Sequence, residues 1–227
     1  MGKLFEKSAI NGLELKNRFV RSATWEGMAD QDGNPMPMLL ETMTALAAAG
    51  VGLIITGHTF ISPEGRANPW QLSIDKDERI DGLRKMTDAV HAAGGRIAVQ
   101  LAHAGAFAAA ALSGMPRLVV SLAESADTSP QKEMDGKDIK AIIEAYAAAA
   151  ERAKAAGFDG LQIHAAHGYL LSQFLSPAFN KRRDDYGGDI NHRIRIHRGI
   201  CHAIRETVGK DFPILIKINC QDFIENG

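Results

Sequence analysis

The sequence predicts an α/β fold in which helices alternate with the strands of a parallel sheet. The first observation is a phrase that recurs along the 227 residues: an alanine-rich helical pattern ends at a glycine and leads into a short apolar run. The second is that these runs show no polar alternation, which is typical of strands buried on both faces. Strands that alternate with helices in this order form parallel sheets.

The first two units follow this order. We expect an opening strand over Arg18–Ala23 and a helix over Met38–Ala49. The phrase AAAGVGLIIT (47–56) contains the end of this helix, then a glycine, and then the second strand. Glycine suits the junction because it can adopt the left-handed conformation that terminates helices. A helix over Asp77–Ala93 and the phrase AAGGRIAVQ (92–100) then predict the third strand.

Two further units complete five predicted strands. A helix over Asp138–Ala156 precedes the strand in AAGFDGLQIH (155–164). A helix over Asn191–Val208 precedes the strand in TVGKDFPILIKI (207–218). Each phrase contains a glycine between the helical pattern and the apolar run, so all four junctions are predicted to use the same helix-ending turn.

The chain is expected to form one domain, because no linker or low-complexity segment divides residues 1–227. Its length suits a single domain with a large core. The longest loops are predicted over Phe60–Lys76 and Ala104–Asp138, after the second and third strands. Parallel α/β proteins build their sites at these C-terminal strand ends, so the loops mark the expected functional face.

Composition narrows the class of function. With 45% hydrophobic and 23% charged residues and a net charge of −1, the chain gives no electrostatic reason to expect nucleic acid or an anionic membrane as a partner. No window is apolar for the length of a membrane span, and the N-terminus lacks a signal-peptide core. The two cysteines, Cys201 and Cys220, suit a reducing cytoplasm. We therefore expect a cytoplasmic protein that binds neither nucleic acid nor a membrane.

Hydrogen-bonding side chains follow or end every apolar run. They are Ser22 and Thr24, His58, Gln100 and His103, His164 and His167, and Lys217 and Asn219. Together they would line a pocket with hydroxyl donors, an amide, imidazoles and one cation. The set includes no pair of carboxylates, and the sequence carries no GxSxG elbow, no P-loop and no GxGxxG after its first strand. This pattern favours a site that holds a planar, electron-accepting cofactor.

Several of these residues also have a purely structural interpretation. Thr24 could be an ordinary β-branched strand residue, and Gln100 could be a buried amide with satisfied partners. Lys217 is harder to explain structurally, because a lysine between isoleucines in a presumed central strand is costly unless an anion or cofactor offsets it.

His164 and His167 allow three interpretations. A metal site has only the HxxH spacing in its favour, with no third ligand at a supportive spacing. Two imidazoles with Tyr169 beside them suit a site that grips a carbonyl oxygen as it becomes anionic, with the phenol delivering a proton. A structural role remains open on the residues alone.

Six segments, in order over almost the whole chain, resemble the Old Yellow Enzyme family of FMN-dependent ene-reductases, also called NADH:flavin oxidoreductases. They are LKNRFVRSAT (15–24), GVGLIIT (50–56), SPEGR (62–66), QLAHAG (100–105), GFDGLQIHAAHGYLLSQFLSP (157–177), and N-KRRDDYGG with NHRIR (180–195). The fifth segment is long and highly specific.

The resemblance implies a (β/α)₈ TIM barrel that binds FMN at the C-terminal ends of its strands. The positions that match cofactor-binding residues are Ser22, Ala23, Thr24, Gly57, His58, Gln100 and Lys217. Gln100 matches the amide at the flavin pyrimidine edge, and Lys217 the cation that stabilises the reduced flavin. His164 and His167 match the pair that binds the activating oxygen of the substrate, and Tyr169 the proton donor. No metal is expected.

The implied activity is reduction of the C=C bond of an α,β-unsaturated carbonyl compound, with NAD(P)H as the hydride source and Tyr169 protonating the α-carbon. Such a barrel needs ~250 residues and eight strands. We therefore expect a barrel truncated after about five β/α units. The alternative is a truncated, non-catalytic fragment that acts as an assembly or binding module through its open sheet edges. In either case we expect a homo-oligomer.

Overall fold

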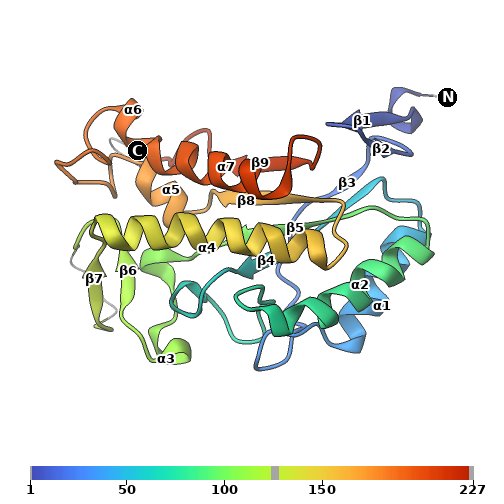
Figure 1. Cartoon of the computed structure of the whole chain (residues 1–227), viewed down its shortest axis with the longest axis horizontal. Coiled ribbons are helices and arrows are strands. Elements are labelled where there is room, and N and C mark those ends of the chain that lie inside the picture. The colour runs from blue at the N-terminus through green and yellow to red at the C-terminus, as the bar shows by residue number, and fades with distance from the viewer. Residues whose placement is uncertain (1, 124–127, 225–227) are drawn as a thin grey trace.

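The computed structural model describes residues 2–123 and 128–224. Its largest sheet is parallel and has the strand order β3-β4-β5-β8-β9 (Figure 1). The bounds are Val20–Arg21 for β3, Leu53–Phe60 for β4, Ile97–Ala102 for β5, Gly160–Ala165 for β8 and Ile214–Ile218 for β9. Each strand pairs with the strand of the next unit, so the predicted parallel α/β arrangement is confirmed.

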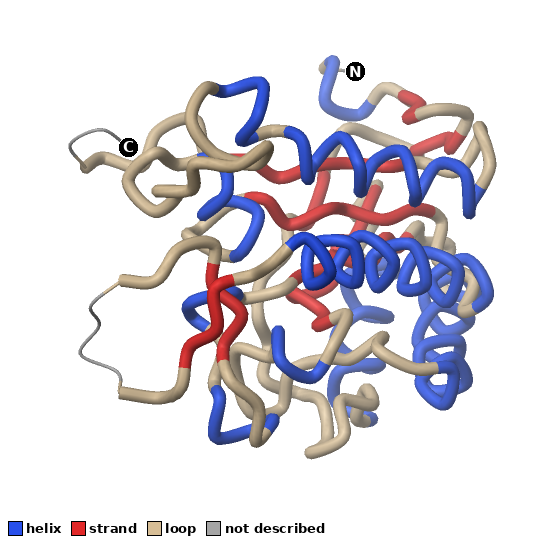
Figure 2. Tube along the Cα trace, turned by 60° about the vertical axis from the view of Figure 1, so that its left-hand side comes forward, coloured by secondary structure: helices blue, strands red, loops and turns tan. Residues whose placement is uncertain are grey.

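Four long helices connect the strands and pack against the sheet (Figure 2). They are α1 (Pro37–Ala48), α2 (Ile80–Ala92), α4 (Gly136–Ala155) and α7 (Arg195–Val208). The glycines that follow them have positive φ angles: 93° at Gly50, 74° at Gly94, 83° at Gly157 and 83° at Gly209. All four glycines thus adopt a backbone conformation that is free of a Cβ clash only for glycine. Gly209 differs from the expected left-handed helical turn, because its ψ is 173°.

The two faces of the sheet have different environments. Val99 and Leu161 point outward into the large core that the sheet shares with the helices. Leu53 and Ala98 point the other way and form a smaller cluster with Leu15. Successive strand residues alternate between the faces, so this second cluster marks the inner face of the sheet.

Shorter elements close the ends of the sheet. The N-terminal hairpin pairs β1 (Ser8–Ile10) with β2 (Leu13–Leu15). The remaining elements are η1 (Lys3–Phe5), η2 (Pro63–Gly65), η3 (Asp77–Arg79), η4 (Gly105–Phe107), α3 (Ala110–Ser113), β6 (Arg117–Val119), β7 (Gln131–Glu133), α5 (Leu170–Leu175) and α6 (Ile190–Arg193). The predicted loop from Ala104 to Asp138 therefore contains a small two-stranded parallel sheet, β6 with β7. Among the described residues, no helix combines the length and the apolar character needed to cross a bilayer.

A β-bulge in β4 changes which side chains face inward. Ile55 pairs with Ala98, but the next pair is His58 with Gln100, so β4 advances by one residue more than β5. An extra residue reverses the alternation beyond it. His58 therefore joins Gln100 on the inner face. Gly57 lies within the bulge and inside β4, whereas the sequence placed both Gly57 and His58 after the strand.

The structure corrects one further detail of the sequence prediction. The opening strand is limited to Val20–Arg21, shorter than the predicted Arg18–Ala23. Within the described residues β9 is the outermost strand of the sheet, and the expectation that Lys217 lies in a central strand stays a prediction. Ile216 and Ile218 on this edge are 45% and 54% exposed.

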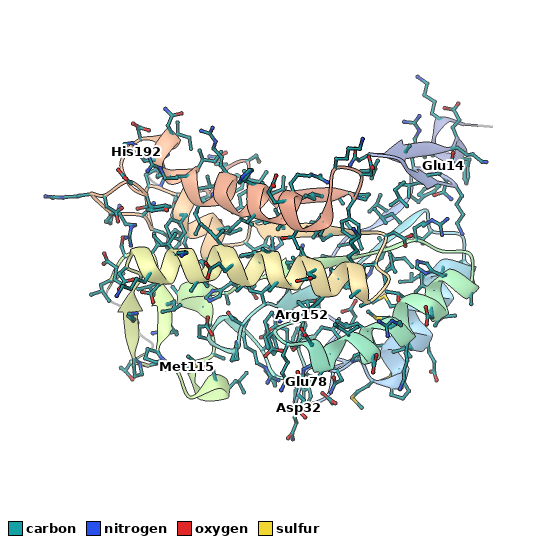
Figure 3. The ribbon with its side chains drawn as sticks, viewed as in Figure 1. Glu14, Asp32, Glu78, Met115, Arg152 and His192 are labelled. Atoms are coloured by element: carbon teal, nitrogen blue, oxygen red, sulfur yellow. The ribbon has the colours of Figure 1, made fainter. Side chains whose placement is uncertain are left out.

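The outer helices are also fixed to the loops by charge pairs. Arg152 of α4, labelled in Figure 3, contacts the carboxylate of Asp77 in η3 with its Nε at 2.7 Å. This contact joins α4, the third of the four long helices, to the segment that leads into α2, the second of them.

Candidate active site

A hollow of about 260 Å³ opens at the C-terminal ends of the parallel strands. Its lining consists of Ala23, Trp25, His58, Gln100, His164, His167, Tyr169 and Lys217. All three expected catalytic residues and four of the expected cofactor-binding residues therefore meet at one place. They come from four strands and one turn, as expected if each strand delivers polar groups at the same edge.

Strand register explains why these side chains converge. His58 is paired with Gln100 across β4 and β5, and Gln100 with Gln162 across β5 and β8. His164 is paired with Lys217 across β8 and β9. Paired residues of neighbouring strands point to the same face of a sheet, so His58, Gln100 and Gln162 form a polar row on the inner face. His164 and Lys217 form a second polar pair two residues further along β8 and β9.

A buried amide pair forms the centre of this row. Nε2 of Gln100 donates to Oε1 of Gln162 at 2.6 Å, and the two side chains are 2% and 8% exposed. Gln162 was not identified from the sequence as a site residue. Its position two residues before His164 in the same strand is the signal that could have found it, since residues at that spacing share a face.

The two histidines differ in exposure. His164 is 3% exposed, and its Nδ1 has no hydrogen-bond partner among the described residues. Burial, with the added repulsion of His167, His58 and Lys217, lowers the pKa of His164 to about 3. His167 is exposed, and burial and then Lys217 lower its pKa. Both imidazoles are therefore neutral near physiological pH and can each donate one N–H.

The rings of the turn lie close together. The centroid of the His164 ring is 5.1 Å from that of His167 and 5.0 Å from that of Tyr169. His167 has a φ of 59°, and its backbone N–H donates to Oδ1 of Asn219 at 3.0 Å. Burial raises the pKa of Tyr169, so the phenol keeps its proton at neutral pH.

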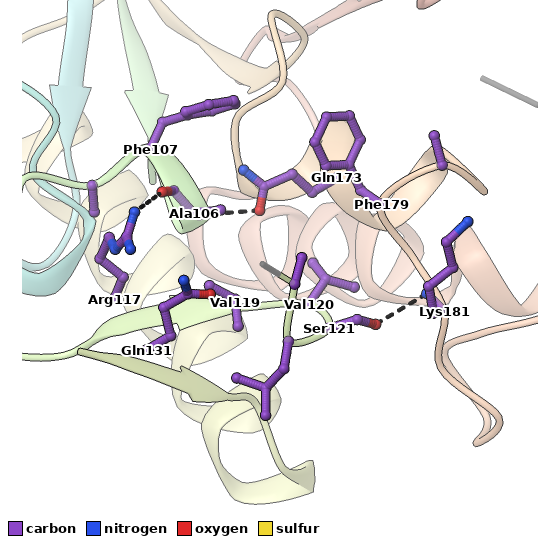
Figure 4. Close-up of a pocket in the computed structure, with 14 residues that line it drawn as sticks. Ala106, Phe107, Arg117, Val119, Val120, Ser121, Gln131, Gln173, Phe179 and Lys181 are labelled. Atoms are coloured by element: carbon purple, nitrogen blue, oxygen red, sulfur yellow. Dashed lines mark hydrogen bonds between the residues drawn. The ribbon is translucent and has the colours of Figure 1, made fainter. Parts of the chain in front are cut away.

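The turn that carries Tyr169 is held by Gln173 of α5. Nε2 of Gln173 donates to the carbonyls of Gly168 at 2.5 Å and Ala104 at 3.2 Å. Its Oε1 accepts from the backbone N–H of Ala106 at 3.2 Å (Figure 4). Because Gln173 is 1% exposed, these bonds fix the turn to the segment after β5. His103, in that segment, is itself fully buried and accepts from the N–H of Gly105 with its Nδ1, so its role is structural.

The segment after β3 borders the hollow, but only some of its predicted cofactor-binding residues line the hollow. Ala23 and Trp25 line the hollow, whereas Ser22 and Thr24 are exposed beside it. The hydroxyl of Thr24 donates to the carbonyl of Ser22 at 3.2 Å. Trp25 was missed by the sequence reasoning; its ring centroid is 6.4 Å from that of His58.

Gly57 supports this segment through a close approach. A Cβ at position 57 would lie 2.6 Å from Oε2 of Glu26 and 2.8 Å from the carbonyl oxygen of Thr24. Glu26 is in turn paired with Arg21 at 2.6 Å, although burial raises the pKa of its carboxyl. Gly57 thus allows the backbone of residues 24–26 to lie directly on the bulge.

A second, larger cavity of about 620 Å³ lies beside the turn (Figure 4). Phe107 lines it, and the ring of Phe107 also lies against Gly168, the residue before Tyr169. Lys181 and Ser121 meet at its far side, where the backbone N–H of Lys181 donates to Oγ of Ser121 at 3.0 Å. The cavity thus reaches, through Phe107, the turn that carries Tyr169.

Metal ligands are not grouped in the described part of the chain. No three His, Cys, Asp or Glu residues there lie close enough together to hold a metal ion. His164 and His167 therefore have no third ligand of these types beside them.

Comparison with known families explains the arrangement. The sequence profile of the NADH:flavin oxidoreductase / NADH oxidase family matches residues 3–227. The chain belongs to this family. The resemblance found in the sequence is thereby confirmed.

Individual relatives agree with this assignment. An NADPH dehydrogenase of Halalkalibacterium halodurans is 40% identical over 226 residues, which are 99% of this chain and 65% of that protein. A metal reductase of Desulforamulus reducens is 40% identical over 225 residues, 99% of this chain and 33% of that protein. The chain thus spans less than two thirds of the length of these relatives.

Solved structures confirm the predicted fold. The old yellow enzyme homologue from Zymomonas mobilis superposes with a TM-score of 0.87 at 31% identity, covering 96% of this chain and 63% of that one. The five-stranded parallel sheet and its helices are accordingly part of a TIM barrel.

Proposed function

We propose that the protein to which residues 1–227 belong is an FMN-dependent oxidoreductase that uses NAD(P)H to reduce the C=C bond of α,β-unsaturated carbonyl compounds. In this proposal all of these residues belong to one FMN-binding domain. The observation that carries it is the convergence of His164, His167 and Tyr169 with Gln100 and Lys217 on one hollow. Membership of the NADH:flavin oxidoreductase family supports the choice of cofactor and hydride source.

The residues of the hollow fit a flavin. The lining offers an amide and an ammonium group, which suit the carbonyl-rich pyrimidine edge of an isoalloxazine, and it includes no carboxylate. The buried, unpartnered Nδ1 of His164 adds a polar atom that a bound molecule could satisfy. The residues that would hold FMN are Ser22, Ala23, Thr24, Gly57, His58, Gln100 and Lys217. When bound, FMN supplies the two-electron chemistry that no side chain here can perform.

The remaining steps belong to the side chains. His164 and His167, both neutral, would each donate an N–H to the carbonyl oxygen of the substrate. Such bonds strengthen as negative charge develops on that oxygen, so they stabilise the transition state more than the ground state. Tyr169 keeps its proton because burial raises its pKa, and its Oη would deliver that proton to the α-carbon.

The test uses the full-length protein. Purified protein is expected to be yellow, with one FMN per chain released on denaturation, and to oxidise NADH or NADPH when cyclohex-2-enone is added. A colourless protein that cannot be reconstituted with FMN would contradict the proposal. A flavoprotein that reduces only oxygen or quinones would refute the enone part alone.

The second candidate is a non-catalytic assembly or binding module, favoured by the exposed sheet edges. Ile216 and Ile218 on β9 are 45% and 54% exposed, and Val20 on β3 at the opposite edge is 48% exposed. Exposed apolar edge strands favour pairing with another chain. This candidate predicts that residues 1–227 expressed alone bind no flavin and associate, as sedimentation velocity would measure. Flavin binding by these residues alone would exclude it.

A further inference from the structure

The hydroxyl of Tyr169 has a histidine beside it. Oη of Tyr169 lies 3.4 Å from Nε2 of His58, and the two rings meet edge to face with centroids 5.6 Å apart. His58 reaches this position only because the bulge in β4 turns it to the inner face. The contact joins the second β/α unit of the chain to the turn after β8.

The same nitrogen of His58 has a second neighbour, Asn68. Nδ2 of Asn68 is 3.3 Å from Nε2 of His58. Asn68 lies in the loop after β4, and its backbone N–H donates to Oε1 of Gln71 at 3.2 Å. Gln71 is fully buried and its Nε2 donates to the carbonyl of His58 at 3.2 Å. The loop after β4 is thus hydrogen-bonded to the backbone of His58, and the side chain of Asn68 in this loop contacts the His58 ring.

These contacts determine the hydrogen-bonding role of each group. An amide nitrogen can donate but cannot accept, so Nε2 of His58 must be the acceptor and the ring proton must lie on Nδ1. The hydroxyl of Tyr169 can then interact with Nε2 only as a donor. Burial, with added repulsion from His167, lowers the pKa of His58 to about 4, which agrees with a neutral ring.

We propose that His58 is a positioning residue for the proton donor Tyr169, and that Asn68 holds His58 in the accepting tautomer. This inference rests on the proposed function, because it assigns a role toward the same proton transfer. His58 restrains the oxygen of Tyr169 at the hollow, where the hydroxyl proton points at Nε2 before the reaction. The hydroxyl then turns this proton from Nε2 toward the α-carbon of the substrate. Proton transfer breaks the O–H bond of Tyr169 and forms a C–H bond at the α-carbon of the substrate, and water returns a proton to the phenolate.

Asn68 also acts on Tyr169 directly. Its side chain hydrogen-bonds the phenol and lowers the Tyr169 pKa, partly offsetting the larger effect of burial. The Asn68 amide thus contacts both His58 and Tyr169. It would stabilise the phenolate that remains after the proton has left, as donors near a charged oxygen do.

A readout that does not depend on turnover tests the geometry. In full-length protein labelled with ¹⁵N in its histidine rings, Nε2 of His58 is expected to resonate as an unprotonated, hydrogen-bonded nitrogen, assigned by its loss in His58→Leu. Tyr169→Phe should move this resonance toward the position of a free acceptor, and Asn68→Ala should bring in the second tautomer. A protonated Nε2, or a resonance unmoved by both substitutions, would overturn the proposal.

Kinetics of the holoenzyme test the consequence. His58→Leu is expected to slow the reaction of the reduced enzyme with cyclohex-2-enone by about tenfold, a part of the roughly 10²–10⁴-fold that a positioned proton donor contributes. His58→Gln, which keeps an acceptor near the Nε2 position, should recover part of this rate. Because His58 is also one of the residues proposed to hold FMN, the comparison is a ratio: oxidation by ferricyanide, which needs no proton from Tyr169, should fall by a smaller factor than the enone reaction in the same variant.

A double substitution separates positioning from a general structural effect. Once Tyr169→Phe is present, His58→Leu should slow the enone reaction no further, because the hydroxyl that it positions is gone. Multiplying effects would contradict the proposal. The matched control is His202→Leu, on the exposed surface of α7, which should leave both rates unchanged. If the wild-type enzyme does not reduce enones, the proposed function fails while the nuclear resonance test still decides this inference.

Discussion

His164 and Lys217 are register partners on the adjacent strands β8 and β9, and both face the hollow. The ammonium group of Lys217 contributes to lowering the pKa values of both His164 and His167. Burial is the larger cause of both lowered pKa values, and the cation adds to it, so the neutral form of both histidines is favoured. The pairing therefore links the expected cofactor side of the site to the expected substrate side.

Lys217→Met should make the bound flavin harder to reduce, because one positive charge near the reduced, anionic form is lost. A loss of about 1.4 kcal/mol corresponds to a reduction potential lower by about 30 mV for a two-electron couple. Spectroelectrochemical titration of the holoprotein measures this shift. Lys210→Met, on the exposed turn after α7, is the matched control and should leave the potential unchanged. An unchanged potential in Lys217→Met would show that this cation does not act on the flavin.

His164→Ala should slow the reaction of the reduced enzyme with an enone by about 10²-fold, the range found when one oxyanion donor is removed. His164→Asn retains a donor of similar reach and should lose less. Reduction by NAD(P)H should change less in both variants than the enone reaction does. Rapid-mixing measurements of the two half-reactions give this comparison, and equal losses in both would contradict a role specific to the substrate oxygen.

Gly57→Ala should weaken both stability and flavin binding. The new methyl would meet Oε2 of Glu26 at 2.6 Å and the carbonyl oxygen of Thr24 at 2.8 Å, and the latter is backbone that cannot move by a simple rotamer change. Overpacking of this kind costs about 1–3 kcal/mol. Urea denaturation and FMN titration measure the two effects. Gly136→Ala, where an added Cβ has open space at the start of α4, is the control and should be neutral or slightly stabilising.

Acid should destabilise the protein through its buried histidines. Burial lowers the pKa of His197 to about 4, while the ordinary histidine value is 6.5. Between these values the unfolded chain binds a proton that the folded protein does not, so stability is fully present above the ordinary value and falls as the pH decreases toward about 4. The slope is about 1.4 kcal/mol per pH unit for each such group. Denaturation midpoints measured across this window should show a smaller slope in His197→Leu, and an unchanged slope would contradict the assignment.

Much of the architecture was predictable because local signals and tertiary structure agree. The glycines after the four long helices carry the positive φ angles that the sequence implied, and the apolar runs form buried parallel strands. The cluster of His164, His167 and Tyr169 was equally accessible, since one strand and one turn hold all three. In these segments the local sequence pattern and the tertiary structure favour the same backbone conformation.

Other features depend on contacts between distant segments. The inward position of His58 requires a bulge that simple alternation does not reveal. Asn68 and Trp25 lie in loops, and each reaches the site through a contact with His58 of β4.

The most direct test of the account is the effect of Tyr169→Phe on the full-length flavoprotein. Rapid mixing of the reduced enzyme with cyclohex-2-enone should give a rate of flavin reoxidation about 10²-fold or more below that of the wild type, as loss of a general acid requires. Reduction of the same variant by NAD(P)H should stay at the wild-type rate. A variant that reacts with the enone as fast as the wild type would contradict the assignment of Tyr169, and with it the account of this hollow as the site of C=C reduction.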